Sequence, residues 1–141
     1  MSELKGKVVW VTGASSGIGR ATALAMAGSG AILILAARRA EALESVASSC
    51  RALGTSATVV VTDVTSRDEC IRLIATAGRV DVLVNNAGFA VFDPVAQAKP
   101  KDLDAMMRTN FFGAIHCTQA VLPQMLARGS GSIVSANFVA Q

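Results

Sequence analysis

Short, continuous runs of apolar residues recur along the chain and predict buried β-strands. Runs of this kind are typical of strands that are covered on both faces, as in a parallel sheet. They differ from the strict alternation of a sheet with one face in water. Five such strands are predicted, within residues 7–13, 31–37, 56–63, 79–88 and 131–136.

Helical patterns separate the predicted strands. Residues 41–53 carry one apolar face at the 3.6-residue period, with Gly54 as the stop signal, and this face consists of Leu43, Val46, Ala47, Cys50 and Leu53. A capping-box pattern at Ser66 and Glu69 predicts the start of another helix, whose apolar residues are Ile71, Ile74 and Ala77.

The longest helical pattern covers residues 102–127. Its apolar stripe consists of Met107, Phe111, Ile115, Thr118, Leu122 and Met125. Pro123 lies inside this pattern, and proline removes a backbone donor and clashes with the preceding turn. We therefore expect a kink or a break at Pro123.

The alternation of strands and helices predicts one doubly wound α/β domain over residues 1–141, with a parallel Rossmann-type sheet in the order 3-2-1-4-5. The last predicted element is a strand without a helix after it, so it is expected to be an uncovered edge. We therefore expect a truncated domain that lacks a C-terminal catalytic and substrate-binding segment.

Composition and charge narrow the possible partners. Hydrophobic residues make up 52% and charged residues 16% of the chain, which is typical of a globular protein. The net charge of +3 comes from scattered basic residues, and only 4% of the residues are aromatic, so nucleic-acid binding is not expected. The apolar runs are too short to span a membrane and no signal peptide is recognisable, so we expect a cytoplasmic protein.

The spacing of Cys50, Cys70, Cys117 and the single His116 indicates no metal site, and we expect Cys50 and Cys70 to pack in the core as reduced thiols.

A glycine-rich segment, VTGASSGIG, joins the first predicted strand to the first helix. Gly13, Gly17 and Gly19 allow a tight turn and a close approach of the backbone to a pyrophosphate. The free amides of the helix N-terminus attract the negative charge, and Ser15 and Ser16 add hydroxyl donors. The segment therefore predicts a dinucleotide-binding loop.

The glycine spacing, with TG before and IG after it, resembles the short-chain dehydrogenase/reductase family. Further motifs match in order along the chain: Asp63-Val64, NNAG at 85–88, Asn110, LPQM at 122–125 and GSIV at 131–134. The resemblance implies that Asn110 is a catalytic residue. It also implies a set of cofactor contacts that includes Ile18 of the glycine loop, Asp63 and Val64 at the adenine, and Asn86, Ala87 and Gly88 after the fourth strand.

The end of the second predicted strand bears on the choice between NAD and NADP. Dinucleotide folds that bind NAD place a carboxylate there for the ribose 2′-hydroxyl, whereas this chain has Ala37 followed by Arg38 and Arg39. A guanidinium suits the 2′-phosphate of NADP. We expect NADP rather than NAD, with Arg38 as the main contact, although both arginines would also fit as surface charge at a helix start.

Most of the catalytic residues that the resemblance implies are missing. The family uses a tyrosine as the acid, a lysine four residues later, a serine after the fifth strand and an asparagine in the long helix. Only Asn110 is present, because the chain contains no tyrosine and Phe138 occupies the serine position. Ser135 and Asn137 lie at odd offsets from Phe138 along the strand, so we expect them on the opposite face.

Two functions remain open. The first is an NADP-dependent oxidoreductase that transfers a hydride between nicotinamide and a small carbonyl or alcohol, inactive as this truncated chain and with a homo-oligomer possible. The alternative is a non-enzymatic module that binds a dinucleotide or a partner, since fold does not determine function. A different Rossmann-type enzyme is disfavoured because it explains neither NNAG nor Asn110.

Overall fold

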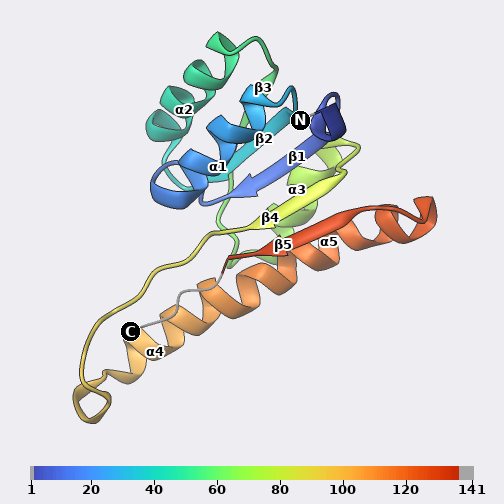
Figure 1. Ribbon diagram of the computed structural model, residues 1–141. Helices are drawn as coiled ribbons and strands as arrows, with labels where there is room; N and C mark the ends of the chain where they lie inside the picture. The colour runs from blue at the N-terminus through green and yellow to red at the C-terminus, as the bar shows by residue number, and fades with distance from the viewer. Residues whose placement is uncertain (1, 137–141) are drawn as a thin grey trace.

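The computed structural model describes residues 2–136 and contains one five-stranded sheet in the order β3-β2-β1-β4-β5. All neighbouring strands are parallel. The predicted strands and their order are therefore confirmed. The strands are β1 Val8–Thr12, β2 Ile32–Ala37, β3 Ala57–Val61, β4 Val82–Asn85 and β5 Ser132–Ser135 (Figure 1).

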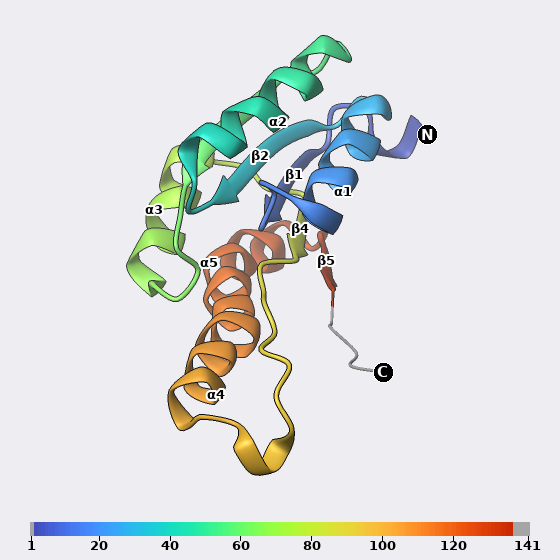
Figure 2. The ribbon, with the colours of Figure 1, turned by 90° about the vertical axis from the view of Figure 1, so that its left-hand side faces the viewer.

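Helices cover both faces of this sheet. They are η1 Ser2–Leu4, α1 Gly17–Gly28, α2 Ala40–Ala52, α3 Arg67–Ala77, η2 Val95–Gln97, α4 Pro100–Met106, η3 Met107–Phe112 and α5 Gly113–Arg128. Figure 2 shows α1 and α2 on one side of the sheet, and α3 and α5 on the other. Both figures show α4 projecting beyond the ends of β4 and β5. Among the described residues, none of the helices has the length and apolarity needed to cross a membrane.

The core is divided by the sheet into two layers. Along β1, Val9 and Val11 pack in the layer beneath α1 and α2, whereas Trp10 packs in the layer that α3 and α5 cover. This alternation follows from the two-residue period of a strand. Because both layers are apolar, the strands read as continuous hydrophobic runs rather than as alternating ones.

The apolar faces of α2 and α3 differ in part from the prediction. Four of the five predicted positions on α2 are buried, but Leu53 lies at the helix C-terminus and is 55% exposed. On α3, Ile71 is 48% exposed, and the buried positions are Cys70 and Leu73. A shift of one residue turns a side chain by about 100° around a helix, which is enough to move it from the core to solvent.

The predicted capping box at the start of α3 is present in one half only. The Ser66 hydroxyl accepts a hydrogen bond from the backbone amide of Glu69 at 3.3 Å, as expected. The Glu69 carboxylate, however, accepts from the amide of Asp63 at 3.3 Å instead of from that of Ser66. The amide of Ser66 already donates to the carbonyl of Asp63 at 3.0 Å. The Ser66 side chain therefore caps α3, and the Glu69 side chain connects α3 to the segment after β3.

The long helix is irregular at a different place from the one predicted. Pro123 lies inside α5, which continues to Arg128, so it does not break the helix. The irregularity is the π-helical segment η3, between α4 and α5. A π turn shifts the phase of the residues that follow it. The buried face of α5 is therefore Gly113, Cys117, Val121 and Met125, while Met107 and Phe111 of the predicted stripe are about half exposed.

The strand β5 forms one edge of the sheet within the described part of the chain. It pairs with β4 alone, and all four of its residues are exposed. The predicted edge is confirmed. Ile133 is 38% and Val134 51% exposed, so apolar side chains remain in contact with solvent on this strand.

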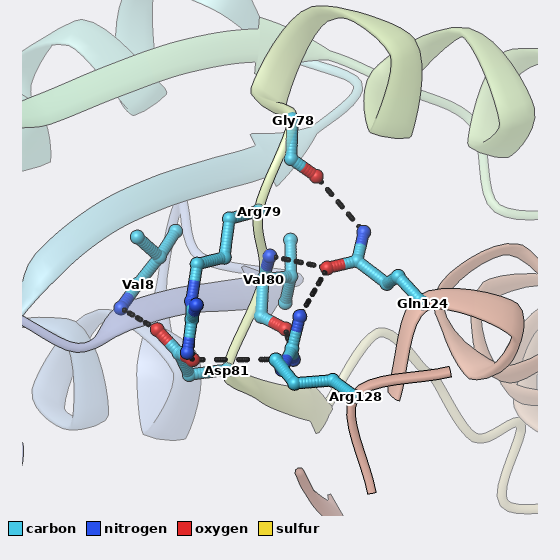
Figure 3. Close-up of polar contacts among 7 residues, drawn as sticks. All are labelled: Val8, Gly78, Arg79, Val80, Asp81, Gln124 and Arg128. Carbon is cyan, nitrogen blue, oxygen red and sulfur yellow. Dashed lines mark hydrogen bonds and ion pairs between the residues drawn. The ribbon is translucent and has the colours of Figure 1, made fainter. Parts of the chain in front are cut away.

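A buried aspartate, Asp81, connects the starts of three strands through its side chain and its backbone, at the end of the sheet opposite to the glycine loop. Asp81 is 8% exposed and accepts hydrogen bonds from the amide of Val8 at 2.9 Å and from Nε of Arg79 at 2.9 Å. Its own amide donates to the Val8 carbonyl at 2.8 Å, and its carbonyl accepts from the amide of Ser132 at 3.0 Å. Asp81 thereby fixes the register of β1, β4 and β5. Figure 3 shows its carboxylate between Val8 and Arg79.

The same end of the sheet is held against α5 by Gln124 and Arg128. The Gln124 amide group accepts from the amide of Val80 at 2.8 Å and donates to the carbonyl of Gly78 at 2.8 Å. Arg128 donates to the carbonyl of Val80 at 2.7 Å and to Gln124 at 3.1 Å. Figure 3 shows these contacts beside the Asp81 carboxylate. The backbone polar groups of Gly78 and Val80, just before β4, therefore form their hydrogen bonds with side chains of α5 instead of with a neighbouring strand.

The substitution Asp81→Asn should lower the free energy of unfolding at neutral pH by about 1.5–3 kcal/mol, the range for hydrogen bonds to charged groups. Burial alone would raise the pKa of Asp81, but the hydrogen bonds from Arg79 and Val8 outweigh it and hold this pKa below its ordinary value. A carboxyl with a lowered pKa in the folded state stabilises the fold above its unfolded-state pKa. This stabilisation is lost as the pH falls through the folded-state pKa.

Urea unfolding followed by the fluorescence of Trp10 at a series of pH values measures this effect. Below about pH 4, where free carboxyls take up protons, the unaltered chain should lose stability more steeply than Asp81→Asn. The exposed Asp93 provides the control, because Asp93→Asn should leave both the stability and its pH dependence unchanged. An identical acid dependence of the unaltered chain and Asp81→Asn would contradict the role given to Asp81.

Candidate functional site

A cavity of about 640 Å³ lies at the ends of the strands where the glycine-rich segment turns into α1. All of the predicted cofactor-binding residues except Gly19 line it. The lining residues are Gly13, Ser15, Ser16, Gly17, Ile18, Ala36, Ala37, Arg38, Arg39, Thr62, Asp63, Val64, Asn86, Ala87, Gly88, Phe89 and Thr109. Segments that are far apart in the sequence therefore meet at one concave site, as is usual where the strand order of an open parallel sheet reverses.

The glycine loop requires its glycines for two different reasons. Gly13 and Gly17 have φ angles of +62° and +56°, a region that other residues adopt at a cost. Gly19 lies behind the loop, where an added Cβ would be 2.2 Å from the carbonyl oxygen of Gly13. The close packing of α1 on the loop therefore depends on Gly19, although Gly19 does not line the cavity.

The N-terminus of α1 opens into this cavity. Ser16 is the N-cap residue, but its side chain makes no capping hydrogen bond. The first amides of the helix are therefore not satisfied by a side-chain cap, and α1 has no acidic residue in its first turn. Free amides and the positive end of the helix dipole favour an anion at this place.

Thr12 and Asn86 hold the glycine loop against the segment that follows β4. The Thr12 hydroxyl accepts hydrogen bonds from the amides of Asn86 and Ala87, both at 2.9 Å. The Asn86 side chain donates to the carbonyls of Thr12 at 3.2 Å and Gly13 at 3.3 Å. Asn86 therefore positions the loop through its side chain. Thr12 was not predicted, although a polar residue at the end of a buried apolar strand is a signal that could have indicated it.

Two exposed arginines stand at the rim of the cavity, directly after β2. Both Arg38 and Arg39 line the cavity and are exposed. Within residues 2–136, no hydrogen bond or ion pair occupies either guanidinium. Their charge is thus available to a bound anion, and no carboxylate takes the place after β2 where an acidic residue would bind a ribose hydroxyl.

The turn after β3 forms another wall of the cavity. The Asp63 carboxylate accepts from the amide and the hydroxyl of Thr65, at 2.9 and 2.8 Å, which holds the turn. Val64 is 6% exposed, and its carbonyl lies 2.8 Å from Nδ1 of His116 on α5, so Nδ1 carries the proton and donates. A Cβ on Gly113 would be 2.6 Å from the Val64 side chain. Sequence reasoning missed the contributions of His116 and Gly113 to this wall.

Asn110 is held by the backbone of the segment after β4. Its side-chain oxygen accepts from the amide of Phe89 at 3.0 Å, and its amide nitrogen donates to the carbonyl of Phe89 at 2.8 Å. Asn110 belongs to the π-helical segment η3, which brings this side chain to the loop. In this arrangement Asn110 fixes the position of Phe89, which lines the first cavity.

A second cavity of about 610 Å³ lies between α5 and the ends of β4 and β5. Its polar lining residues are Thr12, Asn85, Asn110, Thr118, Gln119 and Ser135. Asn85 donates to the Thr118 hydroxyl at 3.2 Å, and its own side-chain oxygen is buried without a partner in the described structure. These amides and hydroxyls can orient a ligand, but none of them exchanges a proton readily at neutral pH.

Ser135 lies within the described residues, whereas the position expected to carry the family's serine does not. Ser135 lines the second cavity together with Asn110. Phe138, which occupies the serine position, and Asn137 lie outside the described residues. That the two faces are opposite therefore stays a prediction.

Known proteins resemble this chain over nearly all of its length. A family model described as short chain dehydrogenase matches residues 7–140. An uncharacterized oxidoreductase of Listeria monocytogenes is 40% identical, over 97% of this chain and 57% of that protein. A metagenomic short-chain oxidoreductase solved in complex with NADP has a TM-score of 0.91 at 36% identity, covering 99% of this chain and 65% of that one. An NAD⁺-bound xylitol dehydrogenase has a TM-score of 0.89 at 38% identity, covering 94% and 53%. The chain thus spans little more than half the length of the curated relatives it matches.

Proposed function

Because the chain belongs to the short-chain dehydrogenase family, we propose that it is the dinucleotide-binding part of an NADP-dependent oxidoreductase. The observation that carries this proposal is that the glycine loop, the two arginines after β2 and the turn after β3 all border the first cavity. The reaction proposed for the whole protein is hydride transfer between the nicotinamide and a small carbonyl or alcohol compound. The nicotinamide would supply the hydride chemistry, and the residues of this chain would bind and orient the cofactor.

The residues around the cavity fit the parts of such a cofactor. The uncapped N-terminus of α1 and the glycine loop suit the pyrophosphate, because amides and the helix dipole favour a doubly charged anion there. Asp63 and Val64 suit the adenine end, where a carboxylate can accept hydrogen bonds beside an apolar wall. Asn86, Ala87 and Gly88, at the opposite wall of the same cavity, suit the nicotinamide side.

The choice of NADP over NAD rests on the arginines. Solved relatives carry either cofactor, since one is described with NADP and another with NAD⁺. The chain has Arg38 and Arg39 at the rim and no carboxylate directly after β2. A guanidinium binds a phosphate monoester through paired charge-assisted hydrogen bonds, whereas it gains little from a ribose hydroxyl.

The substitution Arg38→Ala should weaken NADP binding by about 1.5–3 kcal/mol, the range for a hydrogen bond to a charged group. NAD lacks the 2′-phosphate, so its affinity should change little. Isothermal titration of both cofactors into the unaltered chain and Arg38→Ala measures the difference. Arg39→Ala is the matched variant. Arg39 lies two positions after the end of β2 and Arg38 one, so Arg39→Ala should weaken NADP binding less. Equal weakening of NADP and NAD by Arg38→Ala would overturn the role in 2′-phosphate binding.

A second candidate function has support from the second cavity. Among the described residues, the lining of this cavity contains Asn110 but no tyrosine, lysine or carboxyl group. A protein that binds a dinucleotide without turning it over would need the first cavity and no proton donor in the second. We propose that the 141-residue chain by itself acts in this way, as a binding module. Dinucleotide titration tests binding, and an assay of NADPH oxidation tests turnover.

A further inference from the structure

Two cysteines that are 47 positions apart in the sequence meet in the core. Cys70 of α3 and Cys117 of α5 are both fully buried free thiols, and their sulfur atoms are 3.7 Å apart. Both belong to the core layer that contains Trp10. A disulfide requires a sulfur–sulfur distance of about 2.05 Å, so a closure of less than two ångströms separates the two thiols from a covalent bond.

The third cysteine lies in a different environment. Cys50 of α2 is also a fully buried free thiol, but it packs in the layer on the other face of the sheet. The sheet therefore separates it from Cys70 and Cys117. Cys50 provides an internal control, because it is equally buried and has no neighbouring thiol in the described structure.

The thiol pair is connected to the wall of the first cavity. The sulfur of Cys70 lies 3.9 Å from the carbonyl oxygen of Val64 and is placed to donate to it. The same carbonyl accepts from His116 at 2.8 Å, and Gly113 packs tightly on the Val64 side chain. Val64 lines the first cavity, so the Cys70 sulfur is in contact with a residue of the cavity wall. A change at Cys70 is therefore transmitted to Val64 by direct contact.

We propose that Cys70 and Cys117 form a redox-active dithiol, which hydrogen peroxide converts into a disulfide that joins α3 to α5 and loosens the Val64 wall. Peroxide oxidises the Cys70 thiol to a sulfenic acid and releases one water. The Cys117 sulfur then attacks the Cys70 sulfur, the sulfur–oxygen bond breaks, and the hydroxyl leaves with the Cys117 proton as a second water. The two electrons lost by the thiols reduce the peroxide.

The contact of Cys70 with Val64 and the hydrogen bond between the thiols assign the order of these steps. The hydrogen bond from Cys117 lowers the pKa of Cys70, against the opposing effect of burial. The pKa of Cys117 is raised, because its proton is held by Cys70 and because it is buried. The thiolate is the form that reacts with peroxide, and Cys70 is the thiol whose sulfur contacts the cavity-wall residue Val64, so we assign the first oxidation to Cys70 and the resolving step to Cys117. Since both thiols are buried, the reaction proceeds through local opening of α3 against α5.

The test uses the 141-residue chain under native conditions. The chain is treated with hydrogen peroxide, remaining thiols are blocked, and the intact mass and the proteolytic peptides are measured. The expected result is the loss of the two thiol hydrogens and one cross-linked peptide pair containing Cys70 and Cys117, reversed by a dithiol reductant. The variant Cys50→Ala should give the same cross-link, whereas Cys70→Ala and Cys117→Ala should give none.

Peptide mapping of the unaltered chain decides the inference even if a cysteine variant folds poorly. Two free thiols at Cys70 and Cys117 after peroxide treatment would overturn it, as would a cross-link through Cys50 or one that forms only in denaturant. The effect on the cavity rests on the proposed function and is measured separately with NADP. Loss of a weak hydrogen bond at Val64 should weaken NADP binding by the oxidised chain about two- to fivefold relative to the reduced chain. Failure of the reduced chain to bind NADP would contradict the proposed function alone, whereas equal affinity of both forms would contradict the link to Val64.

Discussion

The 141-residue chain should leave NADPH unoxidised when it is mixed with ketones, aldehydes or quinones. Reduction of a carbonyl needs an acid to protonate the oxygen, and general acid–base catalysis typically contributes ~10²–10⁴-fold. The chain contains no tyrosine, and the polar side chains that line the second cavity within residues 2–136 are amides and hydroxyls. The single histidine is not among the described residues that line this cavity, and its Nδ1 donates to the carbonyl of Val64. The chain is therefore expected to lack the whole rate contribution of general acid–base catalysis, not just part of it.

The assay follows the absorbance of the reduced nicotinamide, with binding of NADP measured on the same preparation. Binding without oxidation is the expected outcome. Joining a family-like segment that bears Tyr-x-x-x-Lys to the chain is the complementary experiment, and it should produce turnover if the second cavity is completed by it. Turnover by the chain alone, retained through repurification and lost in Asn110→Ala, would show that another residue supplies the proton.

The substitution Gly19→Ala should be the most damaging single change at the dinucleotide site. Its Cβ would lie 2.2 Å from the carbonyl oxygen of Gly13 and 2.5 Å from the side-chain nitrogen of Asn86, so the loop and α1 must separate. Overpacking of this kind costs about 1–3 kcal/mol or more. The strain falls on the loop that the pyrophosphate would contact, so NADP binding should weaken by about 5- to 150-fold.

Another glycine of the same helix provides a matched control. Gly28 ends α1, and a Cβ added there would meet nothing within 4 Å. Because alanine favours helices more than glycine, Gly28→Ala should keep NADP affinity and should leave stability unchanged or raise it by up to about 1 kcal/mol. Urea unfolding and NADP titration of both variants measure these effects. Similar losses in Gly19→Ala and Gly28→Ala would mean that the close approach behind the loop is unimportant.

The sheet and most of the candidate site were predictable because their signals are local. Continuous apolar runs between helical patterns indicated five parallel strands, and the structure has them in the expected order. Gly13 and Arg38 follow directly after β1 and β2, and Asp63 lies two residues after the end of β3. The carboxyl ends of parallel strands lie at one edge of a sheet, so residues that follow the strands must come together there. This is the edge where the first cavity lies.

Features that depend on packing between distant segments were not predictable. The sequence marks the π-helical turn at residues 107–112 less clearly than a proline would. The predicted apolar stripe assumed a regular helix through this turn, so it assigned some residues to the wrong face. The exposure of Ile71 follows from how α3 lies on the sheet, which the helical period alone does not determine. The proximity of Cys70 and Cys117 arises only when α3 and α5 pack together.

The position of β1 between β2 and β4 has a consequence for biosynthesis. Residues 8–12 of β1 can pair with residues 32–36 of β2 as soon as α1 has formed between them. The other edge of β1 pairs with residues 82–84 of β4, which leave the ribosome much later. Until then the nascent chain carries an apolar strand with one unpaired edge, a state that is prone to aggregation. A ribosome-bound chain halted before residue 82 should therefore recruit chaperones more strongly than one halted after β4 has emerged.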